Sequence, residues 1–220
     1  TDIQRTKDGH FVIVHDKIID RETTGTGACG NMNLAELKQL YKRYRDGSIS
    51  DERVASLAEF LQVGKNRVVY KADLKPGVSE YFKEIMQQVV KHDALDGIIF
   101  RVPYSRADLF AQYKAEGVIS SRGLLMFMVS SKAQLDDIKT RFDPLMIQID
   151  LNKSNPATPH ALELIQYATR QGLLVEIHDY GTSADWIKFL EAGARMFHTN
   201  KPSEIKGFLH NQNMNKGKSK

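Results

Sequence analysis

The segment "RVVYKADLKPGVSEYFKEIMQQVVKHDALDGIIFRV", residues 67–102, contains two apolar runs separated by a longer amphipathic stretch. The runs at 67–74 and 96–102 are rich in Val, Ile, Phe and Tyr, a composition that favours strands. The stretch at 77–92 has the length and the mixed charged and apolar spacing of a helix. This order predicts a βαβ unit, in which the two strands run parallel because a helix carries the chain back between them.

The same alternation continues along the rest of the chain. Further strands are predicted at 124–129, 145–151, 173–178 and 194–199, and further helices at 105–117, 132–142, 158–172, 183–193 and 203–209. The strands are nearly continuous apolar runs, which suits parallel strands that are buried on both faces. Gly117, Gly172 and Gly193 stand where a helix should give way to a strand. Repeated βα units indicate an α/β domain, either a (β/α)₈ TIM barrel or a doubly wound sheet.

The motifs that would favour a doubly wound sheet are missing. The Gly-rich run "GTGACG", residues 25–30, has no lysine at a strand-to-helix turn and so is not a phosphate-binding loop. We therefore predict a (β/α)₈ barrel over residues 1–208, followed by a polar, basic tail at 209–220. Starting at "TDIQ", about seven barrel strands can be placed. A closed barrel needs one more, so we expect its first strand and helix to precede Thr1 and to be lacking from this chain.

Composition narrows the classes of function. The chain has 220 residues, of which 41% are hydrophobic and 26% charged, as in ordinary globular domains, and no apolar run is long enough to cross a bilayer. The formal net charge is +4, but no basic stripe is interleaved with aromatic residues, so nucleic-acid binding is disfavoured. A phosphate-bearing small molecule remains compatible with this charge. Cys29 is the only cysteine, which excludes an intrachain disulfide, and we expect it to pack or simply to be exposed rather than to react.

The first part of the chain is predicted to begin with a β-hairpin. In "TKDGHFVIVHD", residues 6–16, the Asp8-Gly9 pair is a strong two-residue turn signal. With that pair at the turn positions, the register places Asp2 opposite His15, with Cβ atoms roughly 4.5–5.5 Å apart. A slip of one residue would aim the two groups at opposite faces. After the hairpin we expect a helix at 34–44, a loop at 45–55, and a helix at 56–64 that begins with a Ser56/Glu59 capping box.

Polar residues at strand ends suggest a site for a phosphate ester, because the active site of a (β/α)₈ barrel lies where its strands end. Asp2 and Asp73 can supply oxygen ligands to a hard cation. His15 can transfer a proton near neutral pH. Lys75 offers a positive charge to a phosphate oxygen.

These residues carry a resemblance to a known family. The stretch "DIQRTKDGHFVIVHDKIIDRETTGTG", residues 2–27, resembles the glycerophosphodiester phosphodiesterase family, whose members are phosphodiesterase barrels similar to phosphatidylinositol phospholipase C. The segments "VASLAEFL" (54–61), "DLKP" (73–76) and "HTNKP" (198–202) are similar to later motifs of the same family. The resemblance spans nearly the whole chain, and its most specific motifs lie in the first 76 residues.

The resemblance implies a TIM barrel that hydrolyses glycerophosphodiesters to sn-glycerol 3-phosphate and an alcohol. It implies a divalent metal ion, Ca²⁺ or Mg²⁺, and two histidines for acid–base catalysis. Carried over to this sequence, it makes His15 one catalytic histidine, Asp2 a metal ligand and Lys75 a phosphate-binding residue. Asp73 takes the place of a Glu of the family, where metal binding would either persist with a shifted ion or a bridging water, or be weak. His178, in "VEIHDYG", takes the place of an aromatic position at the barrel mouth, where it would either contact substrate or pack.

Three departures from the family pattern leave other functions open. The family's first histidine lies upstream of Thr1, so the 220 residues alone are expected to be inactive. Asp73 stands where the family has Glu, which shortens the reach by one methylene, and the "VEIHDYG" motif is altered. The alternatives are a barrel of the same family that binds a phosphate ligand without catalysis, and a phospholipase D-like lyase that forms a cyclic phosphate.

Overall fold

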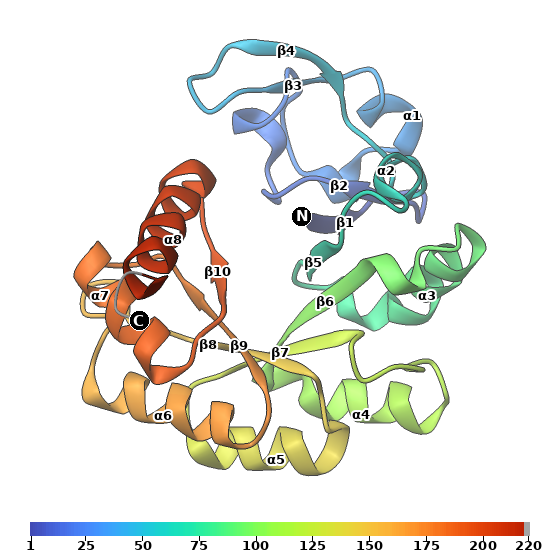
Figure 1. Ribbon diagram of the computed structural model, residues 1–220. Coiled ribbons are helices and arrows are strands. Elements are labelled where there is room, and N and C mark those ends of the chain that lie inside the picture. Colours follow the sequence, from blue (N-terminus) through green and yellow to red (C-terminus); the bar gives the residue numbers. More distant parts are fainter. Residues whose placement is uncertain (218–220) are drawn as a thin grey trace. The chain divides into compact units, whose positions relative to one another are not determined.

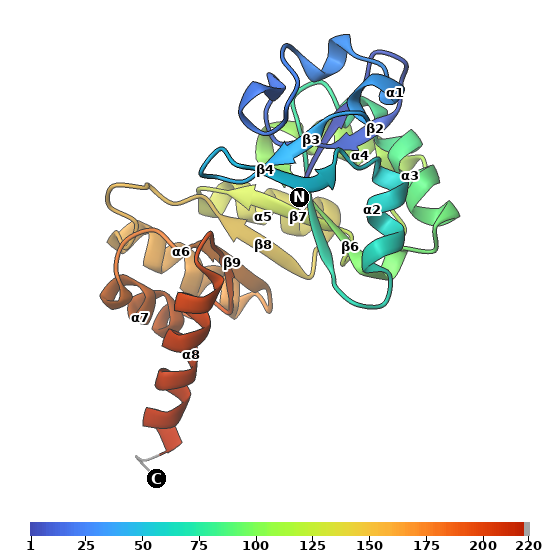
Figure 2. The ribbon, with the colours of Figure 1, turned by 90° about the horizontal axis from the view of Figure 1, so that it is seen from above.

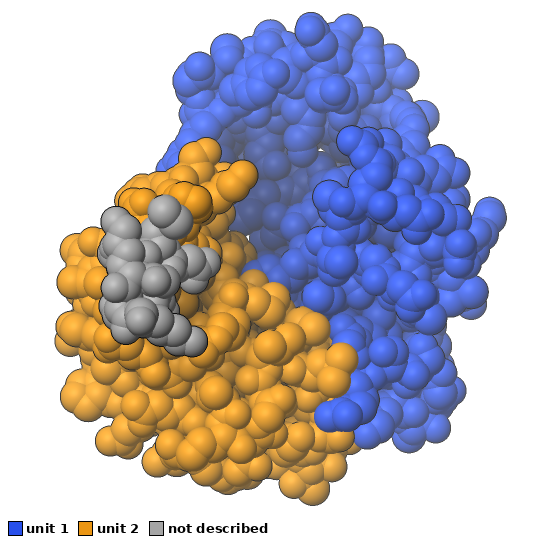
Figure 3. All heavy atoms as spheres, viewed as in Figure 1, with its two compact units in different colours: residues 1–102, 108–124 blue, residues 103–107, 125–220 orange. Residues whose placement is uncertain are grey.

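The structure is a computed structural model that describes the backbone of residues 1–217 and the side chains of residues 1–211. Figure 1 traces its helices and strands. The chain divides into two compact units. Unit 1 comprises Thr1–Val102 and Asp108–Leu124, and unit 2 comprises Pro103–Ala107 and the chain from Leu125 onward (Figure 3). Among the described residues, no helix is both long and apolar enough to cross a membrane.

Unit 1 contains the βαβ arrangement predicted at 67–102. Strands β1 (Asp2–Arg5), β5 (Tyr70–Leu74) and β6 (Ile98–Pro103) run parallel, and β2 (Phe11–Ile13) pairs antiparallel with β1. Helix α3 (Phe82–Lys91) connects β5 to β6, and α4 (Ala107–Ala115) follows β6. The Phe82 ring lies 5.0 Å from the ring of Phe100 and 4.8 Å from that of Phe110. Aromatic packing of this kind fixes the helices against the sheet.

Unit 2 continues the alternation with four parallel strands. They are β7 (Leu125–Val129), β8 (Met146–Ile149), β9 (Leu174–His178) and β10 (Met196–His198), hydrogen-bonded in that order. The helices are α5 (Lys132–Phe142), α6 (Pro159–Arg170), α7 (Ser183–Ala192) and α8 (Pro202–Gly217), and α6 packs on β8 and β9 (Figure 2). Gly172 and Gly193, at the ends of α6 and α7, have φ of +78° and +116°. Both therefore end their helices in the left-handed conformation, as predicted.

The predicted α/β class is thus confirmed, with three parallel strands in unit 1 and four in unit 2 among the described residues. The predicted division into a domain at 1–208 and a tail stays a prediction. Helix α8 crosses residue 208 and ends at Gly217, and residues 218–220 of the expected tail lie outside the described residues.

The helix predicted at 34–44 is wrong. Helix α1 covers only Leu34–Leu37, and the chain then forms β3 (Tyr41–Arg43), which pairs antiparallel with β4 (Ile49–Arg53) in a separate two-stranded sheet (Figure 1). The turn between them contains Asp46 and Gly47, and Gly47 has a φ of +88°. The Asp46 carboxylate accepts hydrogen bonds from the Ser48 amide and hydroxyl at 2.9 and 2.6 Å. This local turn overrides the helical spacing of the apolar residues before it.

The predicted hairpin register is also wrong, by one residue. Ile3 pairs with Ile13 and Arg5 with Phe11, and the Thr6 amide donates to the His10 carbonyl at 2.8 Å. The loop therefore has three residues, 7–9, with Gly9 at a φ of +86°. The Thr6 hydroxyl stabilises it by donating to Asp8 at 2.6 Å and accepting from the His10 amide at 2.9 Å. Because of this shift, Asp2 and His15 do not lie opposite each other, as the predicted register required.

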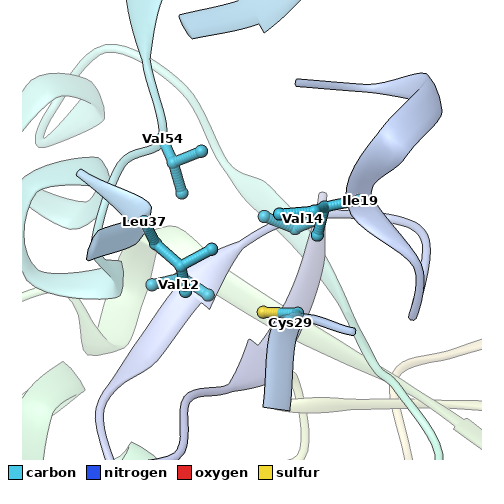
Figure 4. Packing of buried hydrophobic residues seen from close by; sticks show 6 residues of the cluster. All are labelled: Val12, Val14, Ile19, Cys29, Leu37 and Val54. Carbon is cyan, nitrogen blue, oxygen red and sulfur yellow. The ribbon is translucent and has the colours of Figure 1, made fainter. Parts of the chain in front are cut away.

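A small apolar cluster anchors the segment that follows the hairpin (Figure 4). Its buried residues come from β2 and the position after it, from the 3₁₀ turns at Ile19–Arg21 and Cys29–Asn31, from α1 and from the chain after β4. They are Val12, Val14, Ile19, Cys29, Leu37 and Val54. Burial raises the pKa of the Cys29 thiol to about 11, so the thiol stays protonated and unreactive at neutral pH. Of the two roles expected for Cys29, packing or simple exposure, the structure shows packing. Val14 is buried immediately before His15, so the cluster fixes the point from which that histidine projects.

Helix α2 (Leu57–Gly64) begins with the predicted capping box. The Ser56 hydroxyl accepts from the Glu59 amide at 3.3 Å, and the Glu59 carboxylate accepts from the Ser56 amide at 2.9 Å. Lys38 also pairs with Glu59. These contacts, Lys38 first, lower the pKa of Glu59 to about 2. The ionised form is thus preferred in the folded state.

The capping box predicts a pH-dependent contribution to stability. Because the pKa of Glu59 falls from 4.5 to about 2 on folding, its contribution is present above pH 4.5 and is lost as the pH falls toward 2. We expect Glu59→Gln to lower the free energy of unfolding by about 1 kcal/mol at pH 7, after allowance for the exposure of the side chain. Urea unfolding between pH 2 and pH 7 should show this difference shrink below pH 4.5. Glu191→Gln, at an exposed helical position, is the control, and a difference independent of pH would contradict the assignment.

Candidate functional site

Charged residues from three neighbouring strands of unit 1 lie side by side. Asp2 on β1 is in register with Asp73 on β5, and Asp73 is in register with Arg101 on β6. The backbone ladder fixes this alignment, since the Asp73 amide donates to the Thr1 carbonyl at 2.7 Å. Residues in register on adjacent strands present their side chains close together on the same face. The fold therefore creates a row of three charged side chains without help from any loop.

Each carboxylate in the row is paired with a cation. Lys75 Nζ lies 2.7 Å from Asp2 Oδ1, and Arg101 Nη1 donates to Asp73 Oδ2 at 2.8 Å. The four side chains are 17–26% exposed. Partly buried charges need such partners because desolvation is costly. The row and the neighbouring Lys75 thus contain two carboxylates and two cations whose charges balance.

His15 is oriented by its own neighbour in the sequence. Its Nδ1 lies 2.7 Å from Asp16 Oδ1, and Arg21 Nε donates to Asp16 Oδ2 at 2.7 Å. The hydrogen bond with His15, assisted by Arg21, lowers the pKa of Asp16 below its usual value. An ionised carboxylate can only accept, so the proton of a neutral His15 ring belongs on Nδ1. Nε2 then carries a free lone pair, on a ring that is 59% exposed.

Glu22 holds the backbone of the same turn. Its carboxylate accepts from the His15 amide at 3.0 Å and from the Asp16 amide. The possible ligand atoms of His15, Asp16 and Glu22 lie within 4.8 Å of one another, close enough to hold a metal ion. However, the two carboxylates already accept from Arg21 and from two backbone amides. We interpret this cluster as a network that orients His15.

Of the residues predicted for the site, Asp2, Asp73 and Lys75 are brought together in unit 1. His15 is also in unit 1, but its side chain contacts Asp16 rather than Asp2 among the described residues. His178 belongs to unit 2, at the end of β9. Its ring stacks on those of Tyr180 and His198, with centroids 4.6 and 4.4 Å apart. A contact between His178 and substrate stays a prediction.

Two residues of the site were not predicted. Arg101 is recognisable as a polar residue at the end of a strand, and the strand alignment shows that it faces Asp73. Glu22 lies in a loop seven residues after His15 and accepts a hydrogen bond from the His15 amide. No sequence pattern links these two residues. A helix rather than a turn connects β5 to β6, so the register that aligns Arg101 with Asp73 could not be derived from the sequence either.

An α/β fold with carboxylates, a lysine and a carboxylate-oriented histidine at its strand ends suits a protein that acts on phosphate esters. A family model described as "Glycerophosphoryl diester phosphodiesterase family" matches residues 1–204, and the chain belongs to that family. A glycerophosphodiester phosphodiesterase of Caldanaerobacter subterraneus is 34% identical over 82 residues, which are 36% of this chain and 34% of that protein. The matched segment thus spans about a third of this curated relative.

Solved structures show the same fold. The crystal structure of a glycerophosphoryl diester phosphodiesterase from Parabacteroides distasonis matches 96% of this chain and 74% of its own, with a TM-score of 0.78 and 19% identity. A phosphodiesterase from Oleispira antarctica, in complex with the product sn-glycerol-3-phosphate, matches 95% of this chain and 83% of its own, with a TM-score of 0.69 and 18% identity. These likenesses confirm the predicted TIM-barrel class.

Proposed function

We propose that this protein hydrolyses glycerophosphodiesters to sn-glycerol 3-phosphate and an alcohol, with the help of a divalent metal ion. The observation that carries the proposal is the pair of carboxylates Asp2 and Asp73, in register on neighbouring strands and flanked by cations, in a chain of this family. The product found in the Oleispira antarctica structure supports the choice of substrate.

The carboxylate pair suits a hard cation. Asp2 and Asp73 offer oxygen ligands from adjacent strands, the donor type that Ca²⁺ and Mg²⁺ prefer. Remaining positions would be filled by water or by the substrate. When bound, the ion would polarise a phosphoryl oxygen and offset negative charge in the transition state. Lys75, beside Asp2, would place a further positive charge on the phosphate.

His15 would carry one of the two proton transfers that hydrolysis requires. Asp16 keeps the ring proton on Nδ1, which leaves Nε2 to exchange a proton with the nucleophilic water or with the departing alcohol. The exposure of the ring gives a substrate access to that nitrogen. Asp16 also stabilises the imidazolium that forms when Nε2 accepts the proton. His178 is proposed as a residue that contacts the substrate.

Phosphorus NMR of the reaction tests the proposal. The full-length protein, incubated with glycerophosphocholine or glycerophosphoethanolamine and Ca²⁺ or Mg²⁺, should convert the diester resonance into that of sn-glycerol 3-phosphate. A cyclic phosphate would instead identify a lyase. Tight binding of the diester in calorimetry without any product would identify a barrel that binds and does not catalyse.

A further inference from the structure

Arg101 would compete with the proposed metal ion for the carboxylate of Asp73. Its Nη1 donates to Asp73 Oδ2 at 2.8 Å, and the pair is only 17% and 26% exposed. Strand β6 places Arg101 directly in register with Asp73, so the contact is built into the sheet. A charge-assisted hydrogen bond of this kind is among the stronger ones in proteins.

Binding of a guanidinium and a divalent cation to the same carboxylate is unfavourable, because the two positive charges repel each other. With Arg101 in place, Asp73 has one oxygen engaged, and a metal ion arriving there meets a positive charge close by. A phosphate group offers Arg101 an alternative partner, since the planar guanidinium matches phosphate oxygens in a bidentate geometry. Phosphate and metal would thus favour each other's binding, and such coupling is reciprocal.

We propose that Arg101 exchanges partners between Asp73 and the substrate phosphate. It is the counter-cation of Asp73 when no metal ion is bound, and it binds the substrate phosphate when the metal ion takes its place. Arg101 thereby limits the affinity of the metal site and ties metal binding to the presence of a phosphate ester. This inference rests on the proposed function, because it requires Asp73 to be a metal ligand.

The first test measures metal binding without substrate. Titration of the full-length protein with Mn²⁺, followed by electron paramagnetic resonance, should give about tenfold tighter binding for Arg101→Gln, because a nearby positive charge has been removed. Lys83→Gln removes a cation that pairs with Glu116 at 2.7 Å in the same unit and should leave Mn²⁺ affinity unchanged. If Arg101 had only a structural role, its replacement would not strengthen metal binding.

The second test measures phosphate binding in saturating Mn²⁺. Calorimetry with sn-glycerol 3-phosphate should show about tenfold weaker binding to Arg101→Gln, and weaker binding to Arg101→Lys, which keeps the charge and loses the planar fork. Arg101→Lys should bind Mn²⁺ with the affinity of the wild type. If Arg101→Gln fails to fold, Arg101→Lys still tests the contact with phosphate. Mn²⁺ affinity that does not rise in Arg101→Gln, or unchanged affinity for sn-glycerol 3-phosphate, overturns the exchange. Asp73→Asn with wild-type Mn²⁺ affinity would instead refute the proposed metal site itself.

Discussion

Replacing His15 by alanine in the full-length protein is expected to lower kcat/KM for glycerophosphodiesters by about a hundred- to ten-thousandfold, the usual contribution of a positioned acid or base. The reason is geometric. Asp16 fixes the ring through Nδ1, and Nε2 is the atom left for proton transfer. The side chain is 59% exposed, so its removal creates no cavity, and the melting temperature should change little. Initial rates of sn-glycerol 3-phosphate release measure the effect.

His10→Ala is the matched control for this experiment. His10 is another exposed histidine of the same hairpin, whose Nε2 lies 3.9 Å from Asp8 Oδ2, outside the proposed site. Its replacement should leave kcat/KM within about twofold of the wild type, as expected of a surface substitution. A wild-type rate for His15→Ala would remove His15 from the mechanism. Equal losses in both variants would point to the hairpin fold rather than to the imidazole.

Asp73→Asn is expected to weaken metal binding by about a hundredfold or more, and to reduce activity at limiting metal concentrations in parallel. The substitution keeps the shape of the side chain and an oxygen that can accept from Arg101. It removes the negative charge that a hard cation requires. Calorimetric titration with Ca²⁺ gives the affinity directly.

The control for Asp73→Asn removes a carboxylate that belongs to the other unit. Asp137→Asn serves, because Asp137 is on α5 in unit 2, where it pairs with Arg141 at 3.1 Å. Its Ca²⁺ affinity should match that of the wild type. If Asp73→Asn also retained wild-type affinity and activity, Asp73 would be a structural partner of Arg101 and the metal site would have to be sought elsewhere.

Much of the fold follows from the sequence because buried parallel strands and capped helices leave strong local patterns. The strand at 67–74 was recognisable from its apolar run, and helix α2 from Ser56 and Glu59. The helix predicted at 34–44 failed because its apolar spacing was read without the Asp46-Gly47 turn that follows. The Asp46-Gly47 pair is the same kind of turn signal as Asp8-Gly9, so the sequence itself contains the feature that ends the helix.

The site was predictable only in part, because its geometry depends on register. Asp2 and Asp73 were assigned from strand ends, and the ladder between β1 and β5 aligns them. The link between Asp2 and His15 failed because residues 7–9 form a three-residue loop, and one residue of slip changes every pairing. The pairing of Arg101 with Asp73 depends on a neighbouring strand that no local pattern reveals.

We propose that Asp2, Asp73 and His15 form the metal-dependent site of a glycerophosphodiester phosphodiesterase. The most direct measurement is the phosphorus spectrum of the full-length protein with glycerophosphocholine and Ca²⁺, recorded with and without a chelator. We expect sn-glycerol 3-phosphate to accumulate with Ca²⁺, its accumulation to stop in excess chelator, and added Ca²⁺ to restore it. Product formed at an equal rate in the presence of chelator would show that the hydrolysis does not depend on a metal ion at this site.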